Sequence, residues 1–166
     1  MISHLGALVE HRPSLIPGDC DLPNFLNLLL EIVRSESLMV SIPVLSIWVR
    51  LLKSDTISNS DAIANLIGPL LEICSSRLVR YEWLPEDSDN ATLLFLQEDI
   101  DTMPERHAFL GNYRRYCVQV IEMIVQRKPV EAFYHILTRV DHSLKTLYDG
   151  QPPFQSKSLV SLPHRY

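Results

Sequence analysis

Two stretches of the chain, residues 25–52 and 104–148, read as pairs of helices with apolar residues on more than one side. A helix that is hydrophobic on most of its surface must be buried between neighbours. In the first helix, one apolar stripe holds Phe25, Leu28, Leu29 and Ile32, and the adjacent stripe holds Leu26, Leu30 and Val33. Two-helix units of about forty residues that cannot cover their own faces are typical of α-solenoids, in which each repeat completes the core of the next. The pattern therefore predicts an all-α solenoid of stacked antiparallel helix pairs.

Breaks in this pattern divide the chain into helices. The first full pair is predicted over residues 23–34 and 37–53, and Ser60-Asp61 starts a third helix that is expected to bend or restart at Gly68-Pro69. Its predicted partner covers residues 109–127, and Pro129 suits the first turn of the last helix. We therefore expect about three helix pairs within residues 1–150, with an insertion at 82–105 and an extended or disordered tail over 151–166.

Composition narrows the class of protein. With 166 residues and 46% hydrophobic content, the chain can bury a core and is not generally disordered. The net charge of -5 argues against a protein that coats nucleic acid over its whole surface. The cysteines are widely spaced, so Cys74 and Cys117 are expected to be reduced core thiols. Neither a signal peptide nor a run of about 18 apolar residues is present, so we expect an intracellular protein with no membrane partner.

Charge is distributed unevenly along the second half of the chain. Residues 82–105 hold eight carboxylates and no Lys or Arg, whereas basic residues outnumber acidic ones from Arg106 to Lys145, so the two parts should attract each other. The acidic segment is either a solvated loop or an electrostatic latch for a basic partner, and both interpretations stay open. Its candidate partner-binding residues are Glu86, Asp87, Asp89, Glu98, Asp99 and Asp101.

Arg114 and Arg115 form a second candidate, since Tyr113 and Tyr116 lie beside them. Guanidinium groups bind phosphate through a bidentate fork, and tyrosine rings offer a stacking face, so the cluster could contact a phosphate backbone. A solvated helix surface next to core tyrosines is the favoured alternative.

Enzymatic chemistry finds little support in the sequence. Glu131, His135 and His142 lie on one predicted helix, where a metal site is conceivable. No second helix offers obvious complementary ligands, so a solvated or inter-helix polar face is favoured. His107 and Cys117 are ten residues apart, beyond hydrogen-bond reach on a common helix. No phosphate-cradling glycine loop or hydrolase motif appears. We predict that the protein is not an enzyme and needs no cofactor.

Several segments resemble the exportin-5 branch of the importin-beta (karyopherin) family of nuclear transport receptors. They are LPNFLNLLL at residues 22–30, SIWVRLL at 46–52, IGPLLE at 67–72 and LVR at 78–80. In the later part, Asp99-Ile100-Asp101 precedes a helix that begins FLGNYRRY at Phe109, as an acidic loop precedes a similar helix in that family. The resemblance covers residues 22–147.

The resemblance implies a HEAT-repeat, armadillo-like superhelix that binds the small GTPase Ran in its GTP form and exports RNA or protein cargo. Such a receptor contacts nucleoporins and shuttles between nucleus and cytoplasm. Family members are much longer, so we expect this chain to be an interior fragment whose uncovered end helices lead to self-association. The alternative is a generic HEAT-repeat scaffold or complex-assembly subunit, which Ran dependence of binding would distinguish.

Overall fold

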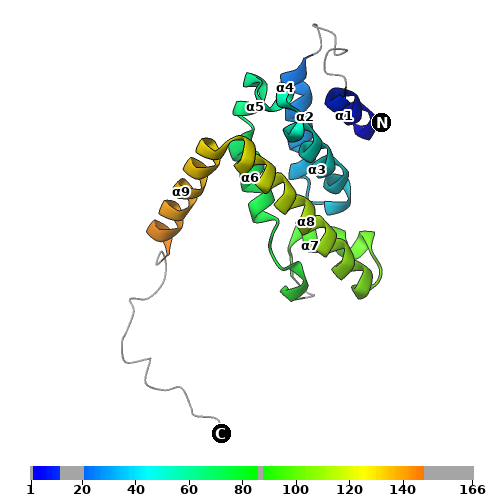
Figure 1. The fold of residues 1–166 in the computed structure, drawn as a ribbon. Coiled ribbons are helices and arrows are strands. Elements are labelled where there is room, and N and C mark those ends of the chain that lie inside the picture. The colour runs from blue at the N-terminus through cyan, green and yellow to red at the C-terminus, as the bar shows by residue number, and fades with distance from the viewer. Residues whose placement is uncertain (1, 12–20, 86–87, 148–166) are drawn as a thin grey trace.

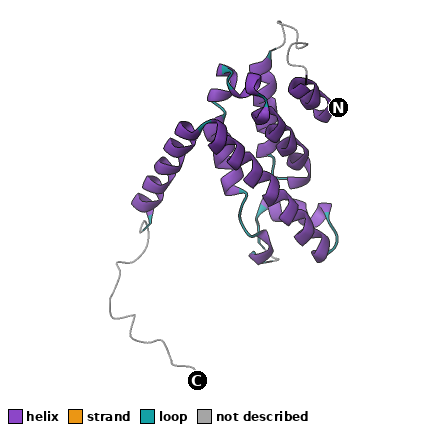
Figure 2. Cartoon of the chain, viewed as in Figure 1, coloured by secondary structure: helices purple, strands orange, loops and turns teal. Residues whose placement is uncertain are grey.

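The computed structural model describes residues 2–11, 21–85 and 88–147, and within these ranges the regular structure is entirely helical (Figures 1 and 2). The all-α, HEAT-like prediction is therefore confirmed. The tail predicted over 151–166 lies outside the described residues. The elements are α1 (Ile2–His11), α2 (Leu22–Arg34), α3 (Leu38–Lys53), α4 (Asp55–Ser58), α5 (Asp61–Ala64), α6 (Ile67–Ser76), the 3-10 turn η2 (Tyr81–Trp83), α7 (Ala91–Asp99), α8 (Met103–Arg127) and α9 (Pro129–Thr146).

Helices α2 and α3 form the first predicted pair. The carboxylate of Asp21 accepts a hydrogen bond from the backbone N–H of Asn24 at 3.0 Å, and Pro23 occupies the first turn, where it needs no donor. Three residues, 35–37, link α2 to α3. Helix α3 lies at the centre of the fold and contacts α1, α2 and α8. Its Trp48 is fully buried, so α3 supplies the middle of the core.

The predicted break near Gly68-Pro69 is confirmed, because α5 ends at Ala64 and α6 begins at Ile67. Pro69 lies in the first turn of α6, where a missing backbone N–H breaks no helical hydrogen bond. By length and composition alone, residues 61–83 are apolar enough to cross a membrane. They are divided among α5, α6 and η2, and Leu70 and Cys74 are fully buried in the core, so we assign the segment to the core.

Helix α8 is longer than its sequence pattern predicts. The apolar pattern over 104–148 starts within one residue of the observed start at Met103, but the individual helix predicted over 109–127 begins six residues too late. Thr102 occupies the N-cap position and Pro104 lies in the first turn, where proline is preorganised for a helix. The charged residues of that turn interrupt the apolar stripe of α8, so the sequence pattern does not indicate that the helix begins there. The buried face of α8 consists of Leu110, Tyr113, Cys117, Val120 and Ile124.

The described residues of the acidic segment, 82–85 and 88–105, are integrated into the fold rather than inserted as a plain loop. Within this segment the structure forms the nine-residue helix α7. The side chain of Asn90 caps α7 by accepting from the backbone N–H of Leu93 at 3.0 Å. Leu96 is 3% exposed and belongs to the main core cluster. The segment therefore contributes to the stability of the domain as well as to its charge.

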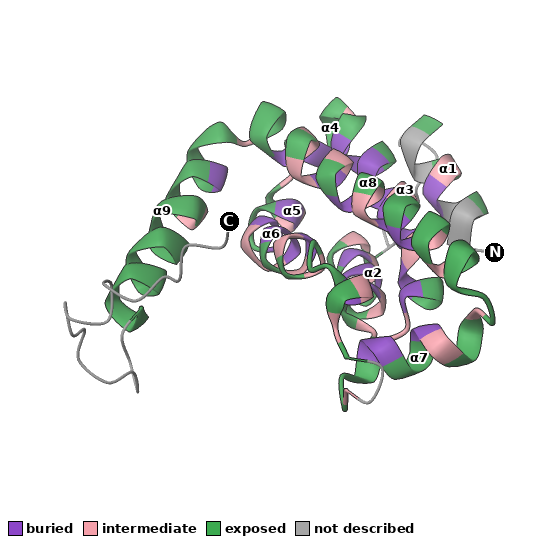
Figure 3. Cartoon of the chain, turned by 90° about the horizontal axis from the view of Figure 1, so that it is seen from below, coloured by how far each residue is buried: buried purple, intermediate pink, exposed green. Residues whose placement is uncertain are grey.

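Helix α9 packs against α6 and α8 but extends away from the rest of the fold (Figure 1). Ala132 is its one buried residue, and most of the remaining ribbon is exposed (Figure 3). The predicted apolar stripe is present on α9, but the described helices α6 and α8 cover it only in part, since Val140 and Leu144 line an open groove beside them. Its exposed large apolar residues are Val130, Phe133, Tyr134, Ile136, Leu137, Val140, Leu144 and Leu147.

Candidate partner-binding site

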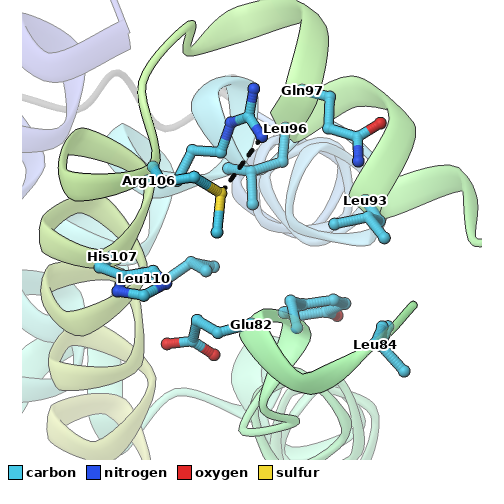
Figure 4. A pocket seen from close by; sticks show the side chains of 10 residues that line it. Glu82, Leu84, Leu93, Leu96, Gln97, Arg106, His107 and Leu110 are labelled. Carbon is cyan, nitrogen blue, oxygen red and sulfur yellow. Dashed lines mark hydrogen bonds between the residues drawn. The ribbon is translucent and has the colours of Figure 1, made fainter. Parts of the chain in front are cut away.

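Glu82 of the acidic segment pairs with Arg114 of α8 beside a pocket that η2, α7 and α8 line (Figure 4). Glu82 lies on η2 and Arg114 on α8, 32 residues further along the chain. Their side chains form a bidentate ion pair, with the two guanidinium nitrogens donating to the two carboxylate oxygens at 2.6 and 3.0 Å. The attraction predicted between the acidic and basic parts is thus realised at this contact.

The Glu82–Arg114 pair is partly shielded from water, because the two side chains are 11% and 21% exposed. The hydrogen bonds from Arg114 lower the pKa of Glu82, against the opposing effect of burial. Arg114 therefore already has an anionic partner within the chain. A phosphate contact by Arg114 would require this pair to break.

Arg115 is placed differently from Arg114, although the two are adjacent in sequence. Successive helical residues project about 100° apart, so they cannot share one face. Arg115 is exposed, donates to the side-chain oxygen of Asn112 at 2.7 Å and lies 5.3 Å from the ring centroid of Tyr116. Tyr113 is fully buried and its hydroxyl is 2.9 Å from that of Ser41. The structure thus separates the predicted Arg-Tyr cluster into one core residue, one internal ion pair and one exposed cation.

The predicted acidic residues also divide into groups. Glu86 and Asp87 lie outside the described residues. Asp99 accepts a hydrogen bond from the hydroxyl of Ser37 at 3.1 Å, which ties the end of α7 to the start of α3. Asp89, Glu98 and Asp101 are exposed, and their carboxylates have no ion pair or hydrogen bond within the described part of the chain. These three carboxylates are therefore available to a partner.

A small apolar pocket lies between η2, α7 and α8 (Figure 4). Its volume is about 90 Å³. Leu93, Leu96 and Leu110 are buried and form the interior, whereas Met103 and His107 are exposed. The remaining lining residues are Tyr81, Glu82, Leu84, Gln97 and Arg106.

Arg106 is held beside this pocket by the loop before α8. Its guanidinium donates to the backbone carbonyls of Ile100 and Asp101 at 2.7 and 3.2 Å. These bonds hold the loop that joins α7 to α8. The Arg106 side chain itself is half-buried. The pocket therefore has a rigid apolar interior and a charged border.

A second polar cluster surrounds Arg77, and sequence reasoning missed it. The Arg77 side chain is 11% exposed and donates to Glu36 at 3.1 Å and to the hydroxyl of Thr92. It also donates to the backbone carbonyls of Arg34 and Ser35. The cluster connects the α2–α3 turn, the end of α6 and the start of α7. No local motif could reveal it, because its members are distant in sequence.

Glu36 shows the electrostatic effect of this cluster. The hydroxyl of Thr92 donates to its carboxylate at 2.5 Å, and this bond, together with Arg77, lowers the pKa of Glu36. The ionised carboxylate is the form that both donors stabilise. We assign the cluster a structural role because its charged and polar groups bond to one another and to backbone carbonyls within the chain.

His135 lies at the contact between α9 and α6, where its Nε2 atom is 3.5 Å from a carboxylate oxygen of Glu72. A guanidinium nitrogen of Arg139 forms an ion pair with the same oxygen at 2.8 Å. The described residues contain no group of three side chains placed to hold a metal ion. The arrangement is the inter-helix polar face that the sequence favours over a metal site.

The two core cysteines lie where α6 packs against α8. Cys74 and Cys117 are fully buried free thiols, which confirms the sequence prediction. A hydrogen bond to Cys117 and burial raise the pKa of Cys74. His107 is exposed at the pocket, so it does not form a nucleophile pair with the buried Cys117.

Comparison with known proteins identifies the family. The Exportin-5 family model matches residues 2–162. An uncharacterized protein of Schizosaccharomyces pombe is 33% identical over 117 residues, which cover 68% of this chain and 9% of that relative. No solved structure matches significantly. Because the family model spans nearly all of the sequence, the chain belongs to the Exportin-5 family.

Proposed function

We propose that this chain forms part of a nuclear export receptor that carries RNA or protein cargo through the nuclear pore together with Ran-GTP. The observation that carries the proposal is the family match over residues 2–162. The helical packing supports it, since stacked helix pairs build the extended concave surfaces that solenoid receptors use. Family membership favours a transport receptor over an enzyme.

The proposal assigns transport to a longer polypeptide than this chain, which spans 9% of the curated relative's length. In such a receptor, each helix pair contributes a short length of superhelix, and small rotations between neighbouring pairs change its curvature. The α9 face supports this role because its apolar residues offer a packing surface to a further helix pair. Nucleoporin contacts and shuttling between nucleus and cytoplasm are parts of the same proposal.

Two surfaces of the described region are the candidates for partner contacts. Asp89, Glu98 and Asp101 are exposed and unpaired within the described part of the chain, so they can face a basic protein surface. Arg115 is the better candidate for a phosphate contact, because Arg114 is occupied by Glu82. Of the two adjacent arginines, only the exposed Arg115 is therefore proposed to contact RNA.

Ran dependence tests the proposal directly. The native protein that contains this chain would be purified from its cells with an affinity tag and mixed with Ran locked in either the GTP or the GDP form. We expect RNA or protein cargo to be retained only with the GTP form, because cooperative binding requires both ligands to favour one receptor conformation. Cargo retention that is equal with both forms would contradict the proposal and favour the generic HEAT-repeat scaffold.

A further inference from the structure

The apolar pocket between η2, α7 and α8 combines two properties that point to a ligand. We propose that it binds a basic peptide segment of a partner protein by accepting one aliphatic side chain, such as leucine, while the surrounding carboxylates attract the flanking Lys or Arg residues. This inference names a partner class for the acidic segment and rests on the proposed role as a binding protein, but not on Ran or RNA.

The size and lining of the pocket favour an aliphatic side chain. A volume of about 90 Å³ exceeds that needed for one water molecule, but it is smaller than the engineered cavity of about 150 Å³ that holds benzene. Leu93, Leu96 and Leu110 supply an apolar interior with no side-chain hydrogen-bonding group. A bound leucine would therefore gain apolar contacts and leave no polar group of these three residues unpaired.

The approach to the pocket is open. Met103 is 45% exposed, and His107 from the next turn of α8 is exposed as well. Figure 4 shows His107 and Leu110 on α8 facing Leu93 and Leu96 on α7, with space between them. The exposed Met103 and His107 place this side of the pocket lining in contact with solvent, where a partner's side chain can approach it.

Charge complementarity identifies the partner as basic. Residues 88–106 carry five carboxylates and a single guanidinium, that of Arg106, which is held by two backbone carbonyls. Glu98 follows the pocket-lining Gln97 in sequence, and Asp101 lies two residues before the pocket-lining Met103. Their carboxylates have no internal partner among the described residues. A basic peptide would be attracted to this field, whereas a nucleic acid would be repelled.

The first experiment measures binding of a fluorescent peptide, Gly-Lys-Lys-Leu-Lys-Lys-Gly, to the full chain at low ionic strength by fluorescence anisotropy. A control peptide replaces leucine with serine and keeps the charge. We expect the serine peptide to bind about tenfold more weakly, because it loses the buried aliphatic group. Equal affinity for the two peptides would overturn the proposal by showing attraction through charge alone.

Variants locate the site. Met103→Lys places a cation at the pocket, and Val125→Lys makes the same kind of change on α8 outside its lining, at a residue with nearly equal exposure of 43% against 45%. We expect Met103→Lys to weaken leucine-peptide binding about tenfold and Val125→Lys to change it less than twofold. Equal effects of the two substitutions would contradict the assignment to this pocket.

Neutralising the free carboxylates tests the electrostatic part. The Glu98→Gln/Asp101→Asn double variant should bind the leucine peptide several-fold more weakly and with reduced salt dependence, whereas Glu122→Gln/Asp61→Asn removes two charges elsewhere. Circular dichroism would verify that each variant is folded. An unchanged affinity in the first variant would show that these carboxylates do not attract the peptide and would overturn the proposed partner class.

Methyl NMR of the full chain provides a readout that is independent of transport. Leucine peptide should shift the methyl resonances of Leu93, Leu96 and Leu110, and serine peptide should not. If the same resonances instead change with protein concentration in the absence of peptide, a second copy of the chain occupies the pocket and the proposal is wrong. Failure of the Ran experiment would leave these peptide results unaffected.

Discussion

Helices α8 and α9 follow each other in sequence and carry similar apolar stripes, but they differ sharply in burial. Five residues of α8 are buried, from Leu110 to Ile124, and all five are at most 1% exposed. In α9, Ala132 alone is buried, while Phe133 is 64% exposed and Leu144 is 66% exposed. The comparison shows that an amphipathic pattern predicts that one face of a helix packs against another element. The pattern does not indicate whether that element belongs to the same chain.

Their neighbours explain the difference. Helix α8 lies between α3 and α6, and its first half is fixed to η2 by the Glu82–Arg114 pair. Helix α9 contacts α6 and α8 on one side only, and open grooves of about 470 and 480 Å³ remain beside α6. We expect the folding free energy of the domain to depend on α8 and to depend little on the outer face of α9.

The largest expected effect comes from truncating the buried face of α8. Ile124→Ala should lower the free energy of unfolding by about 2–5 kcal/mol, because it removes buried methyl groups and leaves a cavity. Leu137→Ala, at a residue of α9 that is 51% exposed, is the matched control and should change stability by about 0.5 kcal/mol or less. Urea unfolding measured by circular dichroism compares the two, and equal losses would remove the distinction between the helices.

Breaking the Glu82–Arg114 pair should have a smaller effect. Glu82→Gln should cost about 1–3 kcal/mol, since it weakens two charge-assisted hydrogen bonds in a partly buried site. Asp141→Asn, which alters the exposed pair of Asp141 and Lys145 on α9, should cost less than about 0.5 kcal/mol. A similar loss of unfolding free energy in both variants would show that the Glu82–Arg114 pair contributes no more than an exposed ion pair.

The same pair predicts a dependence on pH. Because the folded-state pKa of Glu82 is lowered from 4.5, its contribution is present above the unfolded value and is lost as the pH falls through the folded pKa. Stability of the wild-type chain should therefore fall more between neutral pH and pH values below 4.5 than stability of Glu82→Gln. Parallel pH profiles from urea unfolding would contradict the assigned ion pair.

Tyr113→Phe tests a single buried hydrogen bond on α8. The tyrosine hydroxyl is 2.9 Å from that of Ser41, which also donates to the carbonyl of Leu38 at 3.2 Å. Since Ser41 keeps one partner, the loss should be about 1 kcal/mol. Tyr134→Phe on α9, where the side chain is 74% exposed, should be neutral in the same unfolding assay. A neutral Tyr113→Phe would show that the buried hydroxyl contributes no net stability.

The smallest effect on stability, and the clearest effect on association, should come from the exposed face of α9. Leu137→Lys/Leu144→Lys should leave the free energy of unfolding nearly unchanged and should reduce self-association, because it breaks the exposed apolar patch. Light scattering at increasing protein concentration measures this change. A wild-type chain that stays monomeric at high concentration would contradict the expected association.

The sequence was sufficient to predict the helical class, the α2–α3 pair, the break before Gly68 and the core thiols, because local periodicity and proline chemistry decide these features. It placed the start of α8 too late, since Met103, Pro104 and Glu105 do not continue the apolar stripe. The Arg77 cluster and the Glu82–Arg114 pair depend on contacts between distant segments. Charge counting indicated that acidic and basic parts attract, but it could not show that Arg114 is occupied and Arg115 is exposed.

Hydrogen exchange of the full chain tests the central claim most directly, namely that α8 is closed within the core and α9 is an open packing face. We predict that the central amides of α8 exchange only through global unfolding, whereas those of α9 exchange through local opening at much lower free energy. The measurement would be made at a concentration where light scattering shows a monomer. Equal protection of the two helices in the monomer would contradict the account.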